Sequence, residues 1–376
     1  MKTRVKVLLP LLLLLTLPVV VEGQFILTTN NGTITIKGYT GSGGAVDIPS
    51  TTNGLPVTSI GNNAFAASFR LSSVTIPDSV TNIGSEAFYK CFNLTSATIG
   101  TNVASLGDDA FNGCSRLASV SIPASVTSFG NGAFGGCGGL TRITIPNRVT
   151  TIGDWAFASC TSLTSVTIGN SVSNIGDFAF YACSVLTNAT IPIGVTSIGS
   201  SVFYDCTSLI SVTIPISVIS IVSSAFYACD GLTNLTISGG VTSIGSSAFQ
   251  ECGRLTGVYF KGNAPSADSS VFGDTYLTVY YLPGTTNWGS TFGSRPAVVW
   301  NPQVQTSGTT FGVRTNRFGF TITGTAGLVI VVETCTNLAS HTWSPVGTIS
   351  LTGGSSYFSD PQWTNYPTRF YRLRSP

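Results

Sequence analysis

The sequence predicts a repeat solenoid of short parallel strands and short helical or 3-10 turns, followed by a C-terminal all-β, sandwich-like module. Three observations lead to this prediction. A basic and apolar segment opens the chain, several residue types recur every 23 positions through its middle, and the recurrence stops well before the C-terminus. A 23-residue unit is too short to bury its own apolar residues, so neighbouring units have to stack and share one core.

Residues 1–23 have the pattern of a secretory signal peptide. Lys2, Arg4 and Lys6 form a basic start, and the apolar stretch over 7–21 is short for a membrane span. We expect cleavage after residue 23, no membrane span afterwards, and a secreted or cell-surface location; an uncleaved anchor helix is the alternative. Cleavage removes three of the 17 basic and one of the 15 acidic residues, which leaves zero net charge and no field that attracts nucleic acid.

Residues 24–56 are predicted to form an N-terminal β cap. Two strand-like runs, 25–27 and 33–36, are joined by Asn30-Asn31-Gly32, a sequence typical of a hairpin turn. A cap of this kind covers the apolar end that the first repeat would otherwise expose to water.

Residues 57–263 hold nine repeats of 23 residues. One position is always phenylalanine and another always leucine, and a third is cysteine in eight repeats and Ser68 in the first. Phe65 is expected to be less well covered than a central phenylalanine such as Phe157, because one of its neighbours is only a cap. The cysteines in question are Cys91, Cys114, Cys137, Cys160, Cys183, Cys206, Cys229 and Cys252.

The pattern within one repeat predicts its course. The run over 71–76 alternates apolar and polar residues around β-branched ones, which predicts a strand ended by Pro77. After Gly84 comes a position that always holds Ser, Asp or Asn, which are good helix N-caps. A short helical or 3-10 turn carrying Phe88 and Cys91 on its inner face is therefore expected.

The cysteine ladder is predicted to consist of buried free thiols. Disulfides between adjacent turns are the alternative, since export makes them possible. Parallel Cβ vectors on stacked turns would not converge to bridging distance, however. Ser68, which takes the place of cysteine in the first repeat, also indicates that the site needs a small buried residue.

The repeat unit L-x-x-V-T-I-P-x-x-V-T-x-I-G-x-x-A-F-x-x-C resembles the leucine-rich repeats of the BspA-like surface-protein family. The resemblance covers about residues 30–300, and the lead-in from Gly38 to Val57 is similar to the family's entry segment. It implies a curved solenoid on an exported or surface protein. It also implies a role in binding or adhesion, and it offers no catalytic residues to carry over.

The last part of the chain follows another pattern. Residues 264–300 are predicted to form a C-terminal cap. Residues 301–376 are predicted to form a small β-sandwich-like module, with strands near 318–322, 328–332, 345–349 and 370–373.

The C-terminal module itself resembles a terminal β module of exported planctomycete and verrucomicrobial proteins. The residues that carry the resemblance are Glu333, Asn337-Leu338, Trp343, Asp360 and the tail Arg369-Phe-Tyr-Arg-Leu373. Five arginines against two acidic residues make the module mildly basic. Its arginines either contact an envelope polymer or simply form solvated surface.

Material for catalysis or metal binding is scarce. The single histidine, His341, leaves nothing for a His-based metal site or a Ser-His-Asp triad, and no C-x-x-C cluster occurs. Asp108, Asp154 and Asp177 share their repeat position with Ser and Asn, which favours caps over calcium ligands. We therefore expect no enzyme activity, no cofactor and no bound metal.

A binding patch is predicted where the sixth to eighth repeats depart from the pattern. Isoleucines there replace polar residues at outward positions, and a tyrosine follows the buried phenylalanine in three consecutive repeats. Exposed apolar groups with repeated tyrosine suit a contact surface, although drift in a tolerant surface would look the same. The patch residues are Tyr181, Ile193, Tyr204, Ile210, Ile216, Ile219 and Tyr227.

The leading interpretation is a secreted or cell-surface, non-catalytic protein whose solenoid binds a protein or a glycan, with self-association possible. A purely structural envelope or matrix protein without a dedicated ligand is the alternative. Ice binding is a minor third, because an outward row of threonines can order water. That row consists of Thr75, Thr98, Thr144, Thr167, Thr190, Thr213 and Thr236, with Ser121 and Tyr259 completing it.

Overall fold

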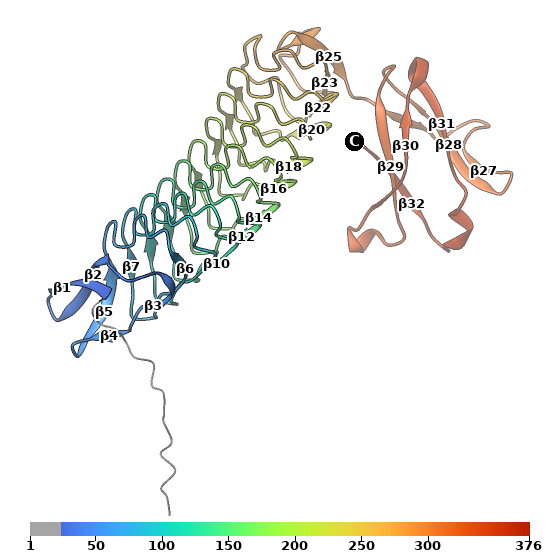
Figure 1. The fold of residues 1–376 in the computed structure, drawn as a ribbon. Coiled ribbons are helices and arrows are strands. Elements are labelled where there is room, and N and C mark those ends of the chain that lie inside the picture. The colour runs from blue at the N-terminus through green and yellow to red at the C-terminus, as the bar shows by residue number, and fades with distance from the viewer. Residues whose placement is uncertain (1–23) are drawn as a thin grey trace, which may run out of the picture.

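The computed structural model describes residues 24–376. They form a β-solenoid of about 11 turns with a separate β module beside its C-terminal end (Figure 1), which confirms the predicted fold class. The predicted signal peptide lies outside the described residues. Within residues 24–376, no helix is long and apolar enough to cross a membrane.

One side of each turn is the predicted short strand, which in most turns pairs in parallel with the same strand of the next turn. Ser96 lies opposite Ser73 on one neighbour and Ser119 on the other, so the register follows the 23-residue period. Side chains alternate along the strand, with Val74 buried and Thr75 exposed. The strands of this first ladder are β6 (Leu71–Thr75), β8 (Ser96–Thr98), β10 (Ser119–Ser121), β12 (Arg142–Thr144), β14 (Ser165–Thr167), β16 (Asn188–Thr190), β18 (Ser211–Thr213), β20 (Asn234–Ile237) and β22 (Gly257–Phe260).

A second parallel ladder of two-residue strands follows the proline turn. Ser105 pairs with Asn82 before it and Ser128 after it, again one repeat apart. The strands of this second ladder are β7 (Asn82–Ile83), β9 (Ser105–Leu106), β11 (Ser128–Phe129), β13 (Thr151–Ile152), β15 (Asn174–Ile175), β17 (Ser197–Ile198), β19 (Ser220–Ile221) and β21 (Ser243–Ile244).

The predicted helical turn is wrong: the third side of each coil is a run of non-helical turns. The backbone N–H of Phe88 donates to the carbonyl of Ala110 in the next turn, at 2.7 Å, rather than four residues back along a helix. Glu86 and Lys90 have positive φ, at 57° and 55°, and this left-handed conformation interrupts any helix. We call this third side the turn side.

The polar position after the glycine bend does not cap a helix either. Where the residue is Asn or Asp, its side chain instead accepts a hydrogen bond from the backbone N–H at the same position of the next turn. Asp108 Oδ1 accepts from the N–H of Asn131 at 2.7 Å, and Asp154 Oδ1 accepts from that of Asp177 at 2.9 Å. Ser, Asp and Asn suit the position because their short side chains carry an oxygen, but they link turns rather than start helices.

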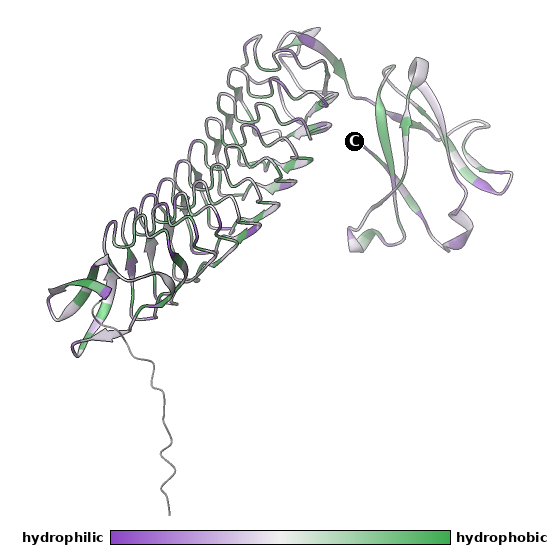
Figure 2. Cartoon of the chain, in the orientation of Figure 1, coloured by the Kyte–Doolittle hydropathy of each residue, from purple (hydrophilic) through white to green (hydrophobic). Residues whose placement is uncertain are grey.

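The core is a continuous stack of aromatic rings. Consecutive phenylalanines from Phe65 to Phe249 lie with ring centroids 4.9–5.5 Å apart and nearly parallel. The expectation that Phe65 is poorly covered is wrong, because Tyr39 from the N-terminal segment stacks on it at 5.0 Å and Phe25 packs edge-on. Hydrophobic residues recur in this way in every turn (Figure 2).

The cysteine ladder is unpaired and buried, as predicted. Each thiol of the ladder donates a hydrogen bond to the phenylalanine carbonyl of the preceding turn; for Cys160 Sγ the acceptor is Phe134 O, at 3.3 Å. Thr275 takes the cysteine position one repeat after Cys252, and its hydroxyl makes the same bond to Phe249 O at 3.1 Å. The position therefore needs a small buried donor.

Thiol labelling tests this arrangement. Burial raises the pKa of Cys183 and Cys252 to about 12, so the reactive thiolate is almost absent at neutral pH. We expect near-zero labelling of the native protein and about nine labelled thiols after unfolding without a reducing agent. Few labelled thiols in the unfolded, unreduced protein would show that disulfides had formed.

The N-terminal segment pairs with the first turn. β1 (Phe25–Asn30) and β2 (Thr33–Tyr39) form the predicted hairpin, and β2 pairs in parallel with β5 (Leu55–Ile60), which leads into the second ladder. β3 (Gly44–Asp47) extends the first ladder, and β4 (Thr51–Thr52) pairs with β5.

The stack continues into the segment for which the sequence predicts a cap. Phe272 adds one more ring, 6.0 Å from Phe249, and Phe292 packs edge-on against Phe272. β23 (Thr278–Tyr281) pairs in parallel with β22, and β25 (Arg295–Val299) with β23, while β24 (Thr291–Phe292) forms a hairpin with β25. This continuation is hidden in the sequence because threonine replaces cysteine and the strand spacing shortens.

Two small antiparallel sheets form the C-terminal module. β28 (Arg317–Thr323) pairs with three strands, and β29 (Val329–Cys335) pairs with two. Phe320 and Ile330 lie in one core with Tyr259 and Tyr280 of the solenoid, so the module packs on its last turns. The remaining elements are β26 (Gln303–Gln305), β27 (Gly312–Arg314), β30 (Ser344–Ser350), β31 (Ser355–Asp360), β32 (Phe370–Arg374) and three single 3-10 turns, η2 (Leu338–Ser340), η3 (Thr352–Gly354) and η4 (Trp363–Asn365).

Candidate binding surfaces

The isoleucines of the predicted patch are strongly exposed. Ile193 and Ile216 hold the same position of consecutive turns, directly after the proline, and are 79% and 70% exposed. Ile219 is 52% exposed beside β19, and Ile210 is 58% exposed just ahead of β18. Ile193, Ile216 and Ile219 border the bend between the two strand ladders, and we call these three residues the isoleucine corner.

The tyrosines of the predicted patch form a stack on the turn side. The ring centroids of Tyr181 and Tyr204 lie 5.0 Å apart, and those of Tyr204 and Tyr227 lie 4.6 Å apart. The Tyr227 hydroxyl donates to the Glu251 carboxylate, which raises the pKa of Tyr227 to about 12. In each turn the isoleucine corner comes before the second ladder and the tyrosines come after it, so the predicted residues occupy two different sides of the coil.

Two aromatic residues outside the predicted patch extend the tyrosine stack. Trp155 lies face to face with Phe178, with centroids 4.0 Å apart and planes within 4°, and packs against Tyr181 at 5.5 Å. We call Trp155, Phe178 and the three tyrosines the aromatic strip. The signal was present in the repeat, because Trp155 and Phe178 hold a position occupied elsewhere by Asn63, Glu86, Asp109, Gly132, Ser201, Ser224 and Ser247.

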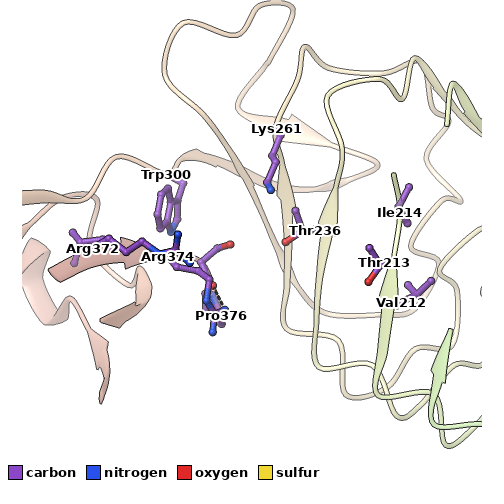
Figure 3. Close-up of a pocket in the computed structure, with 11 residues that line it drawn as sticks. Val212, Thr213, Ile214, Thr236, Lys261, Trp300, Arg372, Arg374 and Pro376 are labelled. Atoms are coloured by element: carbon purple, nitrogen blue, oxygen red, sulfur yellow. Dashed lines mark hydrogen bonds between the residues drawn. The ribbon is translucent and has the colours of Figure 1, made fainter. Parts of the chain in front are cut away.

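A cleft of about 520 Å³ separates the first ladder from the C-terminal module (Figure 3). Thr213, Thr236 and Lys261 line its solenoid side, and Trp300 and Arg374 line its module side. The module also reduces the number of residues in the outward threonine row that are exposed to solvent. Thr236 is half-buried and Tyr259 is buried, so the last two members of the row do not present a free surface.

The arginines of the C-terminal tail are mostly internal partners. The Glu333 carboxylate accepts hydrogen bonds from Arg372 Nε and Arg374 Nε at 2.7 and 2.6 Å, and Arg369 pairs with Asp360 at 3.1 Å. Three of the five arginines that make the module basic are therefore paired with its two acidic residues, and only Arg314 and Arg317 lack a carboxylate partner among the described residues.

The described residues show no grouping typical of a metal centre. Over residues 24–376, no three His, Cys, Asp or Glu side chains are placed to hold a metal ion together. The carboxylates of Asp108, Asp154 and Asp177 each accept a hydrogen bond from a backbone N–H of the next turn. His341 is an exposed residue at the end of the 3-10 turn η2. The surfaces that remain as candidates are therefore contact surfaces.

Comparison with known proteins identifies the repeats. A family model described as "BspA type Leucine rich repeat region", in six copies, matches residues 46–164 and 173–291, and residues 301–376 lie outside the match. The likeness of the C-terminal module to other exported proteins thus stays a prediction. No curated protein matches the chain.

Solved structures of leucine-rich-repeat proteins are similar to part of the chain. A leucine-rich-repeat protein of T. pallidum is 26% identical, with a TM-score of 0.43, over 62% of this chain and 89% of its own. A leucine-rich cell-surface protein of Faecalibacterium prausnitzii is 27% identical, with a TM-score of 0.34, over 64% of this chain and 94% of its own. The family match itself covers more than half of the sequence, and this chain belongs to the BspA-type leucine-rich-repeat family.

Proposed function

We propose that this protein is exported to the cell surface or beyond it and acts there as a non-catalytic binding or adhesion protein for a protein or a glycan. Membership of the repeat family and the signal-like N-terminus support this proposal. The observation that carries it is the exposure of Ile193 and Ile216. Their position holds polar residues in four other turns, namely Asp78, Thr101, Asn147 and Asn170, and small ones, Ala124 and Gly239, in two more, so solubility alone does not account for isoleucine there.

The proposed contact surface comprises Tyr181, Ile193, Tyr204, Ile210, Ile216, Ile219 and Tyr227. Stacked tyrosines offer a large and rigid area that loses little side-chain entropy on binding. The isoleucines add apolar area that a partner would remove from water. The same features suit self-association, in which case the protein would be a structural component of an envelope or matrix without a separate ligand.

A double variant tests the surface. Ile216→Asp with Tyr204→Ser places a charge on the isoleucine corner and breaks the tyrosine stack. We expect at least a tenfold loss of partner binding on protein and glycan arrays, or loss of self-association in sedimentation. The matched control is Asn147→Asp with Tyr89→Ser, which changes the same two positions in earlier turns and should leave both readouts unchanged. Unchanged binding and association in the folded Ile216→Asp, Tyr204→Ser variant would remove this surface from consideration.

A further inference from the structure

One turn of the solenoid presents only one side chain, that of Asn131, over residues 131–136 of the turn side. Ala133 and Phe134 point into the core, and the other positions are Gly132, Gly135 and Gly136. The next turn carries Trp155, Ala158 and Ser159 at these positions, and the preceding turn carries Asp109, Asn112 and Gly113. The result is a notch one turn wide in an otherwise covered surface.

The backbone does not require these glycines. Gly132 has a φ of 61°, but Asp109 and Trp155 adopt 53° and 57° at the same position with full side chains. Gly135 has no positive φ at all. Glycine therefore leaves space at this turn rather than making the turn possible.

The notch has one aromatic wall. Residues around it enclose a cavity of about 400 Å³. Trp155 is 44% exposed and stacks on Phe178 with one face of its indole ring. Because Gly132 is its neighbour on the other side, the second face of the indole has no ring against it and looks into the notch.

The base of the notch, beside the indole, is polar. The Asp109 carboxylate leans over Gly132, where its Oδ1 would collide with any Cβ, and it accepts a hydrogen bond from Asn112 Nδ2 at 2.7 Å. Asn112 Nδ2 in turn lies over Gly135, 2.8 Å from where a Cβ would be. Two hydrogen-bonding groups, an acceptor and a donor, thus face the free side of an indole ring.

This pairing suits a sugar ring. The Asp109 and Asn112 side chains reach over Gly132 and Gly135 into the turn next to Trp155, so a sugar ring stacked on the exposed part of the indole would meet them along its edge. The C–H face of a pyranose complements the negative face of an indole, and its hydroxyls both accept and donate hydrogen bonds. The residues that line the notch include no cation, and Asp109 would repel an acidic sugar.

We propose that this notch is a binding site for a neutral sugar residue of a glycan, which stacks on Trp155 and bonds through its hydroxyls to Asp109 and Asn112. The site is distinct from the isoleucine corner and from Tyr204. Its residues are not part of the proposed contact surface, and its ligand class is a neutral sugar.

The test is a printed array of neutral oligosaccharides (cello-, malto-, manno-, laminari-, xylo- and chito-) and acidic ones (galacturonate and alginate), probed with the purified protein. The best-bound neutral oligomer is then titrated by calorimetry. We expect at least one neutral series and no acidic series to bind. Trp155→Ala removes the stacking face and Gly132→Asn fills the notch, so each should weaken binding at least tenfold. Trp155→Phe should retain part of the binding.

Two controls separate this site from a general effect. Asn occupies the position of Gly132 in another turn, as Asn63 with a φ of 58°, so the backbone admits Gly132→Asn, and the flexible end of Asp109 has to move aside for the new Cβ. Ser224→Asn makes the same change outside the notch and should bind as the native protein does, as should Ile216→Asp with Tyr204→Ser. If no neutral oligosaccharide binds, or if Gly132→Asn binds as well as the native protein, the sugar site is wrong. Neither result bears on the proposed contact surface.

Discussion

Raising the pH to about 9.5 is expected to cost the protein on the order of 10 kcal/mol of folding free energy, because seven ladder thiols then favour the unfolded chain. Burial is the main cause that raises the pKa of six of these thiols in the folded state, whereas at Cys114 the hydrogen bond with Cys91 is the larger cause and burial the second. The unfolded chain titrates near pH 8.5. Each thiol contributes ~1.4 kcal/mol per pH unit above that value. The seven are Cys114, Cys137, Cys160, Cys183, Cys206, Cys229 and Cys252.

The sign follows from where the protons are held. The folded state keeps them and the unfolded state releases them, so this stability is complete below about pH 8.5 and declines as the pH rises toward about 12, the folded-state pKa of Cys183 and Cys252. Cys91 does not join the set, because its hydrogen bond with Cys114 lowers its pKa. Total stabilities of about 5–15 kcal/mol are usual, so alkaline unfolding should be evident before pH 10.

Urea unfolding under reducing conditions, repeated from pH 7 to pH 10, measures this loss. Cys160→Ser with Cys183→Ser is the control, since serine fills the equivalent position at Ser68 and does not titrate in this range. Removing two of seven titrating groups should make the pH dependence shallower by ~3 kcal/mol per pH unit. A free energy of unfolding that stays constant between pH 8 and pH 10 would contradict the buried thiol ladder.

Phe157→Ala is expected to lower the free energy of unfolding by about 3–5 kcal/mol. Phe157 is fully buried in the stack, with Phe134 and Phe180 each 5.5 Å away and Phe129 edge-on. Truncation removes apolar area from the core and leaves a cavity between two rigid turns that cannot close on it. Denaturant melts of the variant and the native protein measure the difference.

Two further variants set the scale for Phe157→Ala. Phe65→Ala should cost about as much, because Tyr39 makes the end of the stack as complete as its middle. Phe69→Ala removes a ring that stacks on Phe92 outside the core, and it should cost less than about 1 kcal/mol. Similar losses for Phe69→Ala and Phe157→Ala would speak against a core built on the phenylalanine stack.

The period of 23 made the core predictable, because a residue that recurs in every turn has to meet its own copies. The phenylalanine, leucine and cysteine positions are buried as the repeat implies. Local sequence preference could not tell whether the residue at the Asp108 position caps a helix or bonds to the next turn, because both uses need the same short polar side chain. Only the left-handed conformation of residues such as Glu86, which no composition rule anticipates, decides between them.

The candidate surfaces were predictable only in part. Departures from the repeat located the isoleucine corner and the tyrosines, but the pairing of Trp155 with Phe178 and the empty turn at Gly132 involve a position that differs in each of the first six repeats and is serine only in the last three. A varied position has no consensus from which to deviate, so these residues stand out only when neighbouring turns are seen side by side. In the C-terminal module, β26, β27 and β31 escaped prediction because they are short or largely polar.

The hydrogen bonds between turns have a mechanical consequence. The bonds at Asp108, Cys160 and Phe88 all reach only the adjoining turn, so the force needed to detach one turn does not depend on how many remain. Under tension along its axis, the solenoid would yield one turn after another, and each turn would release up to about 80 Å of extended chain. A protein of this design can lengthen in equal steps under load while the rest of it stays folded.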